Sequence, residues 1–293
     1  MTTVINTLAT ETPAAATFNL AEELWGSMQA GLAPWQKTWK GGEAPGRPEN
    51  VTTGKEYRSG NSLYLMTMAL KNGWSGKWVS FVESMKLGGD LKGQRGSKIE
   101  VPLIKKGIDK KTGIEKEILR GFRTCAVFNV DQVTGVDFVG KTPTNPIESV
   151  AAADKMLAAL QAQGLTYVEP SENGGCWYLP DEDKIGMPMR GAFADSYEFY
   201  SALIHEMSHA TMKEGRVERE RISFAYEELR AEIAATMVCC SLNLPRSQAQ
   251  VDNHASFLKA WLEEFVDQKP MLLKAASEAQ LIHDYLMDLS KGV

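Results

Sequence analysis

The sequence of 293 residues lacks C-x-x-C pairs, long apolar runs and a basic start. Its four cysteines therefore suggest neither a zinc ribbon nor a dithiol redox motif. No apolar run approaches the ~18 residues that a membrane-spanning helix needs. Residues 1–17 contain no Lys or Arg, so they lack the positive region of a signal peptide. We therefore expect a cytoplasmic protein that has no membrane partner and begins with a disordered leader over residues 1–17.

The net charge of −5 hides an asymmetry between the two halves of the chain. Residues 1–145 carry 19 Lys and Arg against 14 Asp and Glu, whereas the remaining residues carry 13 against 23. The basic half is the one suited to contact with a polyanion. At roughly 100–200 residues per domain, the length favours two domains. We expect two α+β domains, over residues 18–140 and 147–293, joined by a linker of residues 141–146.

Hydrophobic spacing and turn residues predict the elements of each half. In the basic half we expect helices over residues 18–30, 61–71 and 81–87, and strands over 99–104 and 123–130. Residues 105–121 between those strands are either a long hairpin or a mobile loop. In the acidic half we expect helices over residues 146–163, 196–212, 224–242, 253–265 and 270–289, with a hairpin over 176–189.

Histidine is scarce, and two of the four histidines stand in the run His205-Glu206-Met207-Ser208-His209. Two side chains four residues apart share one face of a helix, so His205 and His209 can bind one metal ion. Glu206 follows the first histidine and is placed to take a proton from a metal-bound water. This is the mechanism that the H-E-x-x-H pattern carries. We therefore predict metal-dependent peptide hydrolysis with Glu206 as the general base.

A third ligand is expected on the following helix. Eighteen residues separate His209 from Glu228, a spacing that resembles the gluzincin class of metallopeptidases. The resemblance implies that Glu228 binds the metal and that Glu232 holds a histidine from behind, although these two roles could be exchanged. Glu227 should face away. Zinc is the expected ion for a His₂Glu set, with manganese or another divalent ion as alternatives.

Two further features of the acidic half bear on catalysis. His254 either stabilises an oxyanion as a catalytic residue or caps the start of a helix. The segment 184–188 precedes the H-E-x-x-H helix, and in zincins such an edge strand can pair with an extended peptide substrate.

The basic half concentrates aromatic and basic side chains, with five of the seven tryptophans within residues 25–78. Proteins that bind single strands without sequence preference combine a basic groove with aromatic rings on which bases stack, each worth about 1–3 kcal/mol. We expect Trp25 and Trp78 to belong to the core. The predicted contacts with single-stranded nucleic acid are Trp35, Lys37, Trp39, Lys55, Tyr57, Arg58, Trp74, Lys92 and Arg95.

Several runs, taken in order, resemble one known family. These are residues 34–39, 47–50, 53–61, 78–81, 88–96 and 127–133 in the basic half, and 226–232 in the acidic half. They are similar to the ArdC family of plasmid antirestriction proteins, whose N-terminal domain is shared with TraC-type primases. Ser59 stands where that pattern usually has glycine.

The resemblance implies a domain that binds single-stranded DNA, followed by a gluzincin-like α+β metallopeptidase domain. It also implies action during conjugative transfer, in which incoming plasmid DNA escapes restriction. The protein substrate is unknown, and a component of the restriction system is one candidate. Two alternatives stay open: a non-proteolytic DNA-binding protein whose metal site is structural or regulatory, and an acidic mimic of DNA.

Overall fold

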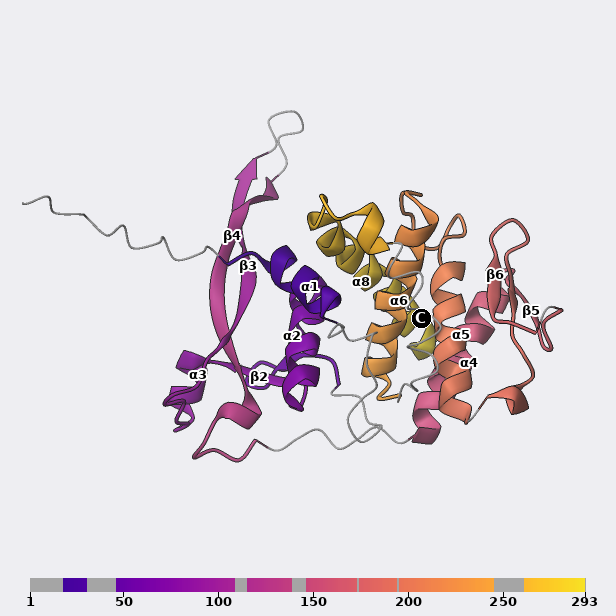
Figure 1. The fold of residues 1–293 in the computed structure, drawn as a ribbon. Helices are drawn as coiled ribbons and strands as arrows, with labels where there is room; N and C mark the ends of the chain where they lie inside the picture. The colour runs from indigo at the N-terminus through magenta and orange to yellow at the C-terminus, as the bar shows by residue number, and fades with distance from the viewer. Residues whose placement is uncertain are drawn as a thin grey trace, which may run out of the picture.

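The computed structural model describes residues 18–30, 46–108, 115–138, 146–172, 174–193, 195–244 and 261–292. In this part of the chain it shows two α+β domains side by side (Figure 1). None of the described helices is both long and apolar enough to span a membrane. The predictions for the leader, for residues 141–145 of the linker, and for Trp35, Lys37, Trp39 and His254 lie outside the described residues.

The N-terminal domain is a four-stranded sheet with two helices on one face. The strands β1 (Glu49–Asn50), β2 (Lys77–Ser80), β3 (Ser97–Ile108) and β4 (Glu115–Asn129) lie in the order β1-β2-β4-β3. Helix α1 (Leu20–Gln29) starts where Asn19 accepts hydrogen bonds from the backbone N–H groups of Ala21 and Glu22. It packs on α2 (Ser59–Asn72), and both contribute to the core beside the sheet. As predicted, Trp25 and Trp78 are buried.

The third helix of this domain lies at the base of the sheet. Helix α3 (Phe81–Lys86) follows β2 without a loop and starts at a capping box. In that box the Ser80 hydroxyl accepts from the Glu83 N–H, and the Glu83 carboxylate accepts from the Ser80 N–H. The chain then returns to β3 through the glycine-rich residues 88–96.

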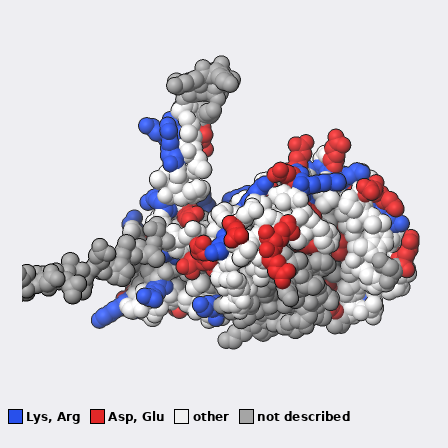
Figure 2. All heavy atoms as spheres, turned by 45° about the horizontal axis from the view of Figure 1, so that its top comes forward, with Lys and Arg blue, Asp and Glu red and all other residues white. Residues whose placement is uncertain are grey.

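Strands β3 and β4 form a hairpin that extends well beyond the predicted strands. Pairing runs from Ser97 with Val127 to Ile108 with Glu115, with a β-bulge between Pro102 and Ile104. The bulge sets two residues of β4, Arg120 and Gly121, opposite Leu103 of β3, and the φ of 141° at Gly121 favours a residue without a Cβ. The described parts of the segment that the sequence left open therefore pair as a hairpin, and its strands extend away from the rest of the molecule (Figure 2).

The C-terminal domain combines long helices with a small sheet. Helix α4 (Pro146–Ala162) leads to the strands β5 (Thr166–Val168), β6 (Trp177–Leu179) and β7 (Lys184–Gly186). Their order is β5-β7-β6, so β7 is the central strand. The prediction that residues 184–188 form an edge strand is wrong, because β5 pairs in parallel with the side of β7 that β6 leaves open. The edge strand next to the following helix is β6.

The last described helices join the two domains. Helices α5 (Ser196–Ala210), α6 (Phe224–Ser241) and α8 (Pro270–Lys291) pack together, and α8 also packs against α1, α2 and α4. One continuous hydrophobic core runs through both domains. Within it the rings of Trp25 and Trp261 lie 5.3 Å apart between centroids.

Candidate metal centre

The two halves of the site lie on adjacent helices that pack against each other. Helix α5 begins where Asp195 accepts a hydrogen bond from the Glu198 N–H, and it carries both histidines on its buried second half. Helix α6 begins at Ser223, whose hydroxyl accepts from the Tyr226 N–H. These caps fix where each helix starts. Glu228 thereby comes to lie one turn into α6, opposite the two histidines.

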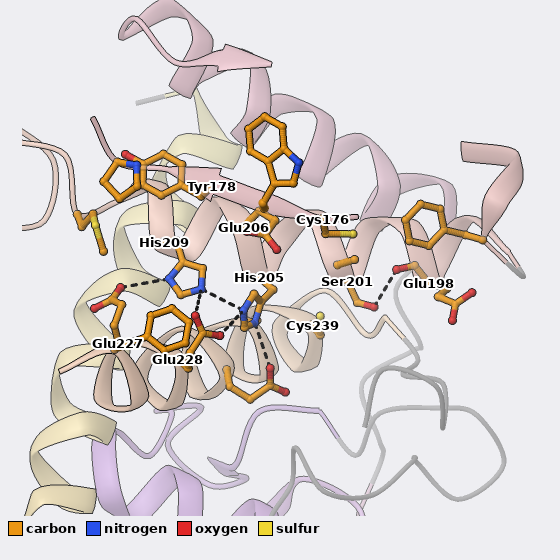
Figure 3. A pocket seen from close by; sticks show the side chains of 18 residues that line it. Cys176, Tyr178, Glu198, Ser201, His205, Glu206, His209, Glu227, Glu228 and Cys239 are labelled. Atoms are coloured by element: carbon orange, nitrogen blue, oxygen red, sulfur yellow. Dashed lines mark hydrogen bonds and ion pairs between the residues drawn. The ribbon is translucent and has the colours of Figure 1, made fainter. Parts of the chain in front are cut away.

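Two imidazoles and one carboxylate converge on a single point. The Nε2 atoms of His205 and His209 are 3.1 Å apart. The Glu228 carboxylate lies 3.6 Å from the His205 Nε2 and 3.4 Å from the His209 Nε2. One ligand atom from each of the three residues lies within 4.8 Å of the others. The three residues proposed from sequence as metal ligands are therefore together, as Figure 3 shows.

The opposite nitrogen of each histidine faces its own carboxylate. The Nδ1 atom of His205 lies 3.1 Å from the Glu232 carboxylate, the contact expected of that residue. The Nδ1 atom of His209 lies 3.4 Å from the Glu227 carboxylate. The prediction that Glu227 faces away is therefore wrong. Such contacts fix the tautomer and ring orientation of a histidine, so both Nε2 atoms are directed to the common point.

Two buried arginines explain why Glu227 turns inward. Arg219 donates to one Glu227 oxygen at 2.8 Å, and Arg230 donates to the other through Nε at 2.9 Å. Arg230 also donates to Glu278 of α8 at 2.6 Å. Burial tends to raise the pKa of Glu227, but His209, Arg219 and Arg230 outweigh it and lower that pKa to about 2. The Glu227 carboxylate is therefore ionised at neutral pH.

The charged groups of the site shift one another's pKa values. Burial tends to lower the pKa of both histidines, yet the neighbouring carboxylates raise it above the ordinary value. Burial raises the pKa of Glu206, whereas both histidines oppose that rise. A metal ion binds the deprotonated nitrogen, so the site must release protons when it is loaded.

A cavity of about 630 Å³ opens beside these residues. His205, Glu206, His209 and Glu228 line it, and Trp177 of the edge strand β6 also lines it. Figure 3 shows Glu206 on the opposite side of the imidazoles from Glu227 and Glu228. The remaining wall is largely apolar, with Phe193, Ala202, Met212, Phe224 and Ala235.

The donor set suits a divalent ion. Two neutral imidazoles and one carboxylate are an accepted protein set for catalytic zinc, in which a further position stays open for water or substrate. The same donor types also bind manganese. Among the described residues this trio is the one group of histidine, cysteine and acidic side chains close enough together to hold an ion.

Comparison with known proteins agrees with this geometry. A family model described as a zincin-like metallopeptidase matches residues 151–278, and one described as the N-terminal domain of the anti-restriction factor ArdC matches residues 15–128. The metal-free crystal structure of antirestriction protein ArdC from the R388 plasmid is 30% identical, with a TM-score of 0.72. The alignment covers 93% of this chain and 97% of that one. The chain belongs to the ArdC antirestriction family.

Further relatives of this ArdC-family chain include two much longer proteins. The Mn(II)-bound structure of the R388 protein aligns at 30% identity and a TM-score of 0.68, over 92% of this chain and 96% of that one. Two DNA primases TraC of Escherichia coli are 29% and 27% identical over 92% of this chain, which spans 19% and 26% of their length. An uncharacterised protein of Sinorhizobium fredii is 28% identical over 94% of this chain and 92% of its own length.

The described DNA-contact candidates do not form one surface in this ArdC-family structure. Arg58 is exposed but pairs with Asp284 of α8. Tyr57 is half-buried, and its backbone oxygen accepts from Arg47. Trp74 is half-buried and packs edge-on against Trp78.

The three other described candidates are exposed. Lys55 lies in the turn after β1, whereas Lys92 and Arg95 lie in the loop before β3. The sequence could not reveal that Arg58 faces α8, because Asp284 is 226 residues away.

Proposed function

We propose that this chain is an antirestriction protein that binds single-stranded DNA during conjugative plasmid transfer and hydrolyses a protein substrate with a divalent metal ion. The convergence of His205, His209 and Glu228 beside Glu206 carries the enzymatic part. The Mn(II)-bound R388 relative supports a divalent ion. Membership of the ArdC family supports the antirestriction and DNA-binding parts.

The residues of the site have separate tasks in this proposal. His205, His209 and Glu228 would hold the ion, which when bound would polarise the scissile carbonyl and make water more acidic. Glu206 lines the same cavity and accepts a proton from the attacking water, then passes it to the leaving amine. Its raised pKa, caused by burial, favours such a shuttle. Glu227 and Glu232 keep the imidazole rings oriented.

Strand β6 offers a way to hold the substrate. It is an edge strand of the three-stranded sheet, and Trp177 and Tyr178 of β6 line the cavity. An extended peptide could add to this edge through main-chain hydrogen bonds. A peptide bound in this way would have its scissile bond close to Glu206. The apolar wall of the cavity suits an apolar side chain next to that bond.

The decisive variant is Glu206→Gln, which removes the base and keeps the side-chain shape. We expect it to bind Zn²⁺ or Mn²⁺ as the wild type does, measured by calorimetry, and to lose cleavage of casein or of the chain itself by at least about 100-fold. Glu198→Gln is the matched control, since Glu198 lines the same cavity but lies outside the trio.

Two outcomes would contradict the enzymatic proposal. If Glu206→Gln lost its metal, the assignment of Glu206 as a base would be wrong. If the metal-loaded wild type cleaved nothing, including the proteins of a restriction system, and Glu206→Gln kept full antirestriction activity in conjugation, the site would be structural or regulatory.

A further inference from the structure

We propose that single-stranded DNA lies on the face of the N-terminal sheet opposite α1 and α2, with bases stacked on Phe81 and Phe122. This inference rests on the DNA binding proposed above and names the surface that would perform it. The outer face is defined here by Phe122, Thr124, Ala126 and Phe128 of β4, together with Phe81 of α3.

The pairing of β3 with β4 fixes which side chains share this face. The register is regular from Ser97–Val127 to Pro102–Phe122, so alternate residues point to opposite faces. Val127 belongs to the core shared with α2. Phe128 instead joins a separate small cluster with Val79, Leu91 and Val133 on the other side. Phe122, Thr124 and Ala126 follow the alternation of Phe128 and therefore point outward.

Aromatic rings are available to solvent on the outer face. Phe122 is 57% exposed and Phe81 is 52% exposed, and the Phe81 ring lies 6.3 Å from that of Phe128. Between these rings β4 carries the small side chains of Thr124 and Ala126, both exposed. On β3 their partners Lys98 and Glu100, and Pro102 opposite Phe122, share this face. No described helix covers this stretch above α3 (Figure 1). Large exposed aromatic side chains separated by small ones suit planar bases, which stack on any aromatic face.

Positive charge borders the same face. Residues 86–98 contain four basic side chains and one acidic side chain. Leu91, in the middle of this segment, packs in the small cluster with Phe128, which places the loop at the outer face. Lys92 and Arg95 are exposed and form no ion pair with any described residue, whereas the exposed Lys86 lies near the Glu83 carboxylate. Lys92 and Arg95 carry this part of the inference. They are therefore free to contact phosphates, which supply most of the affinity of non-specific binding.

The basic residues near α8 are less suited to this task. Arg58 pairs with Asp284, and the buried Arg47 donates to Gln280. Both side chains are thus engaged with α8 across the domain boundary. The unpaired cations and the exposed rings thus coincide on the outer face, which favours a stacking polyanion over a purely apolar protein partner.

The test measures binding of the full chain to a labelled single-stranded oligonucleotide and the matching duplex by fluorescence anisotropy, across a salt series. We expect Phe81→Ala and Phe122→Ala each to weaken single-strand binding by about 5- to 150-fold. Phe122→Tyr should bind as the wild type does, and Phe122→Leu should behave like Phe122→Ala, because stacking needs a ring. Leu281→Ala, another exposed apolar position, is the control and should have no effect.

Charge is tested with the double variant Lys92→Glu/Arg95→Glu. It should reduce the slope of log affinity against log salt by about 1.4, which corresponds to two lost phosphate contacts. The charge-matched control Lys71→Glu/Lys155→Glu changes exposed residues elsewhere and should leave the slope unchanged. Circular dichroism melts should show that every variant folds.

The outcomes separate this inference from the function on which it rests. If the wild type does not prefer the single strand, both fail. If it does, but the Phe81 and Phe122 variants keep wild-type affinity, the DNA lies elsewhere and the proposed function stands. If Phe122→Leu binds as the wild type does, the ring is not a stacking platform. Equal slope changes in both charge variants would show a net-charge effect only.

Discussion

Three glutamates within six residues of α6 illustrate how far spacing alone predicts a site. Glu228 and Glu232 are four apart, so helical geometry places them on one face toward α5, as the sequence indicated. Glu227 precedes Glu228 and should point away by the same rule. Its side chain instead reaches the His209 Nδ1, because Arg219 and Arg230 surround it. Those arginines come together only in the folded chain, so spacing could not predict this contact.

The geometry distinguishes the ligand from the two supporting carboxylates. Glu228 faces both Nε2 atoms, whereas Glu232 lies 3.1 Å from the His205 Nδ1 on the other side of that ring. We therefore predict the largest loss of metal affinity for Glu228→Gln. Glu232→Gln and Glu227→Gln should each lower affinity by about 10- to 100-fold, because their histidines lose orientation. Titration calorimetry with Zn²⁺ and Mn²⁺ measures all three.

The metal-free proteins provide the control for that series. Glu227→Gln leaves the buried Arg219 without its carboxylate, while Arg230 keeps Glu278, so it should also lower the free energy of unfolding by about 3–5 kcal/mol. Glu232→Gln changes the carboxylate that faces the His205 Nδ1, and its free energy of unfolding is measured beside that of Glu227→Gln. A larger affinity loss for Glu232→Gln than for Glu228→Gln would mean that the two roles are exchanged.

At the scale of elements, helices were more predictable than strand partners. The apolar periodicity of α1, α2 and α5 follows from their own residues, and these helices appear close to the predicted bounds. The central position of β7 depends on its pairing with β5, although β6 lies between these two strands in the sequence. Long-range pairing of three-residue strands leaves little local pattern. The length of the β3–β4 hairpin was likewise ambiguous, because its bulge interrupts the alternation that identifies strands.

The start of α2 carries a conformation that its residue disfavours. Ser59 has a φ of +52°, in the left-handed region, at the position where the family pattern usually has glycine. A Cβ is penalised in this region, whereas glycine accepts it at a smaller cost in chain entropy. We predict that Ser59→Gly raises the free energy of unfolding by about 0.5–1 kcal/mol. Urea denaturation measures the change.

The matched control for Ser59→Gly is Ser277→Gly, in the interior of α8, where glycine should destabilise by about 1 kcal/mol. The hydrogen bond from the Ser59 N–H to Gln280 uses the backbone and survives the substitution. Equal destabilisation of both variants would show that the left-handed backbone at Ser59 is not costly to the protein.

At the scale of the whole molecule, α8 connects the N-terminal domain to the candidate metal site. Its Glu278 accepts a hydrogen bond from Arg230, which also binds Glu227. Its Gln280 accepts hydrogen bonds from Arg47 and from the Ser59 N–H, both in the other domain. The sequence predicted a helix here but gave no indication of these contacts, since each joins residues far apart in the chain. The two domains are therefore coupled through one helix rather than through a linker alone.

The contact between α8 and the N-terminal domain should make the free energy of unfolding depend on pH. Burial tends to raise the pKa of Asp284, but His283, Arg58 and Gln280 outweigh it and hold that pKa well below the ordinary value. A carboxylate whose pKa is depressed by folding stabilises the protein above its unfolded pKa of about 3.9, and this contribution is lost as the pH falls toward the folded value. We predict that Asp284→Asn lowers the free energy of unfolding at pH 6 and flattens its fall below about pH 4.

Urea denaturation at a series of pH values measures both effects, and Asp288→Asn is the control. Asp288 lies on the same helix but pairs only with the exposed Lys291 among described residues, so its loss should change little. Asp284 also faces Arg58 across the domain boundary, so Arg58→Gln should reproduce part of the flattening. If Asp284→Asn kept the acid dependence of the wild type, the Arg58–Asp284 pair would not stabilise the joint, and the packing of α8 on α2 would hold the domains together without it.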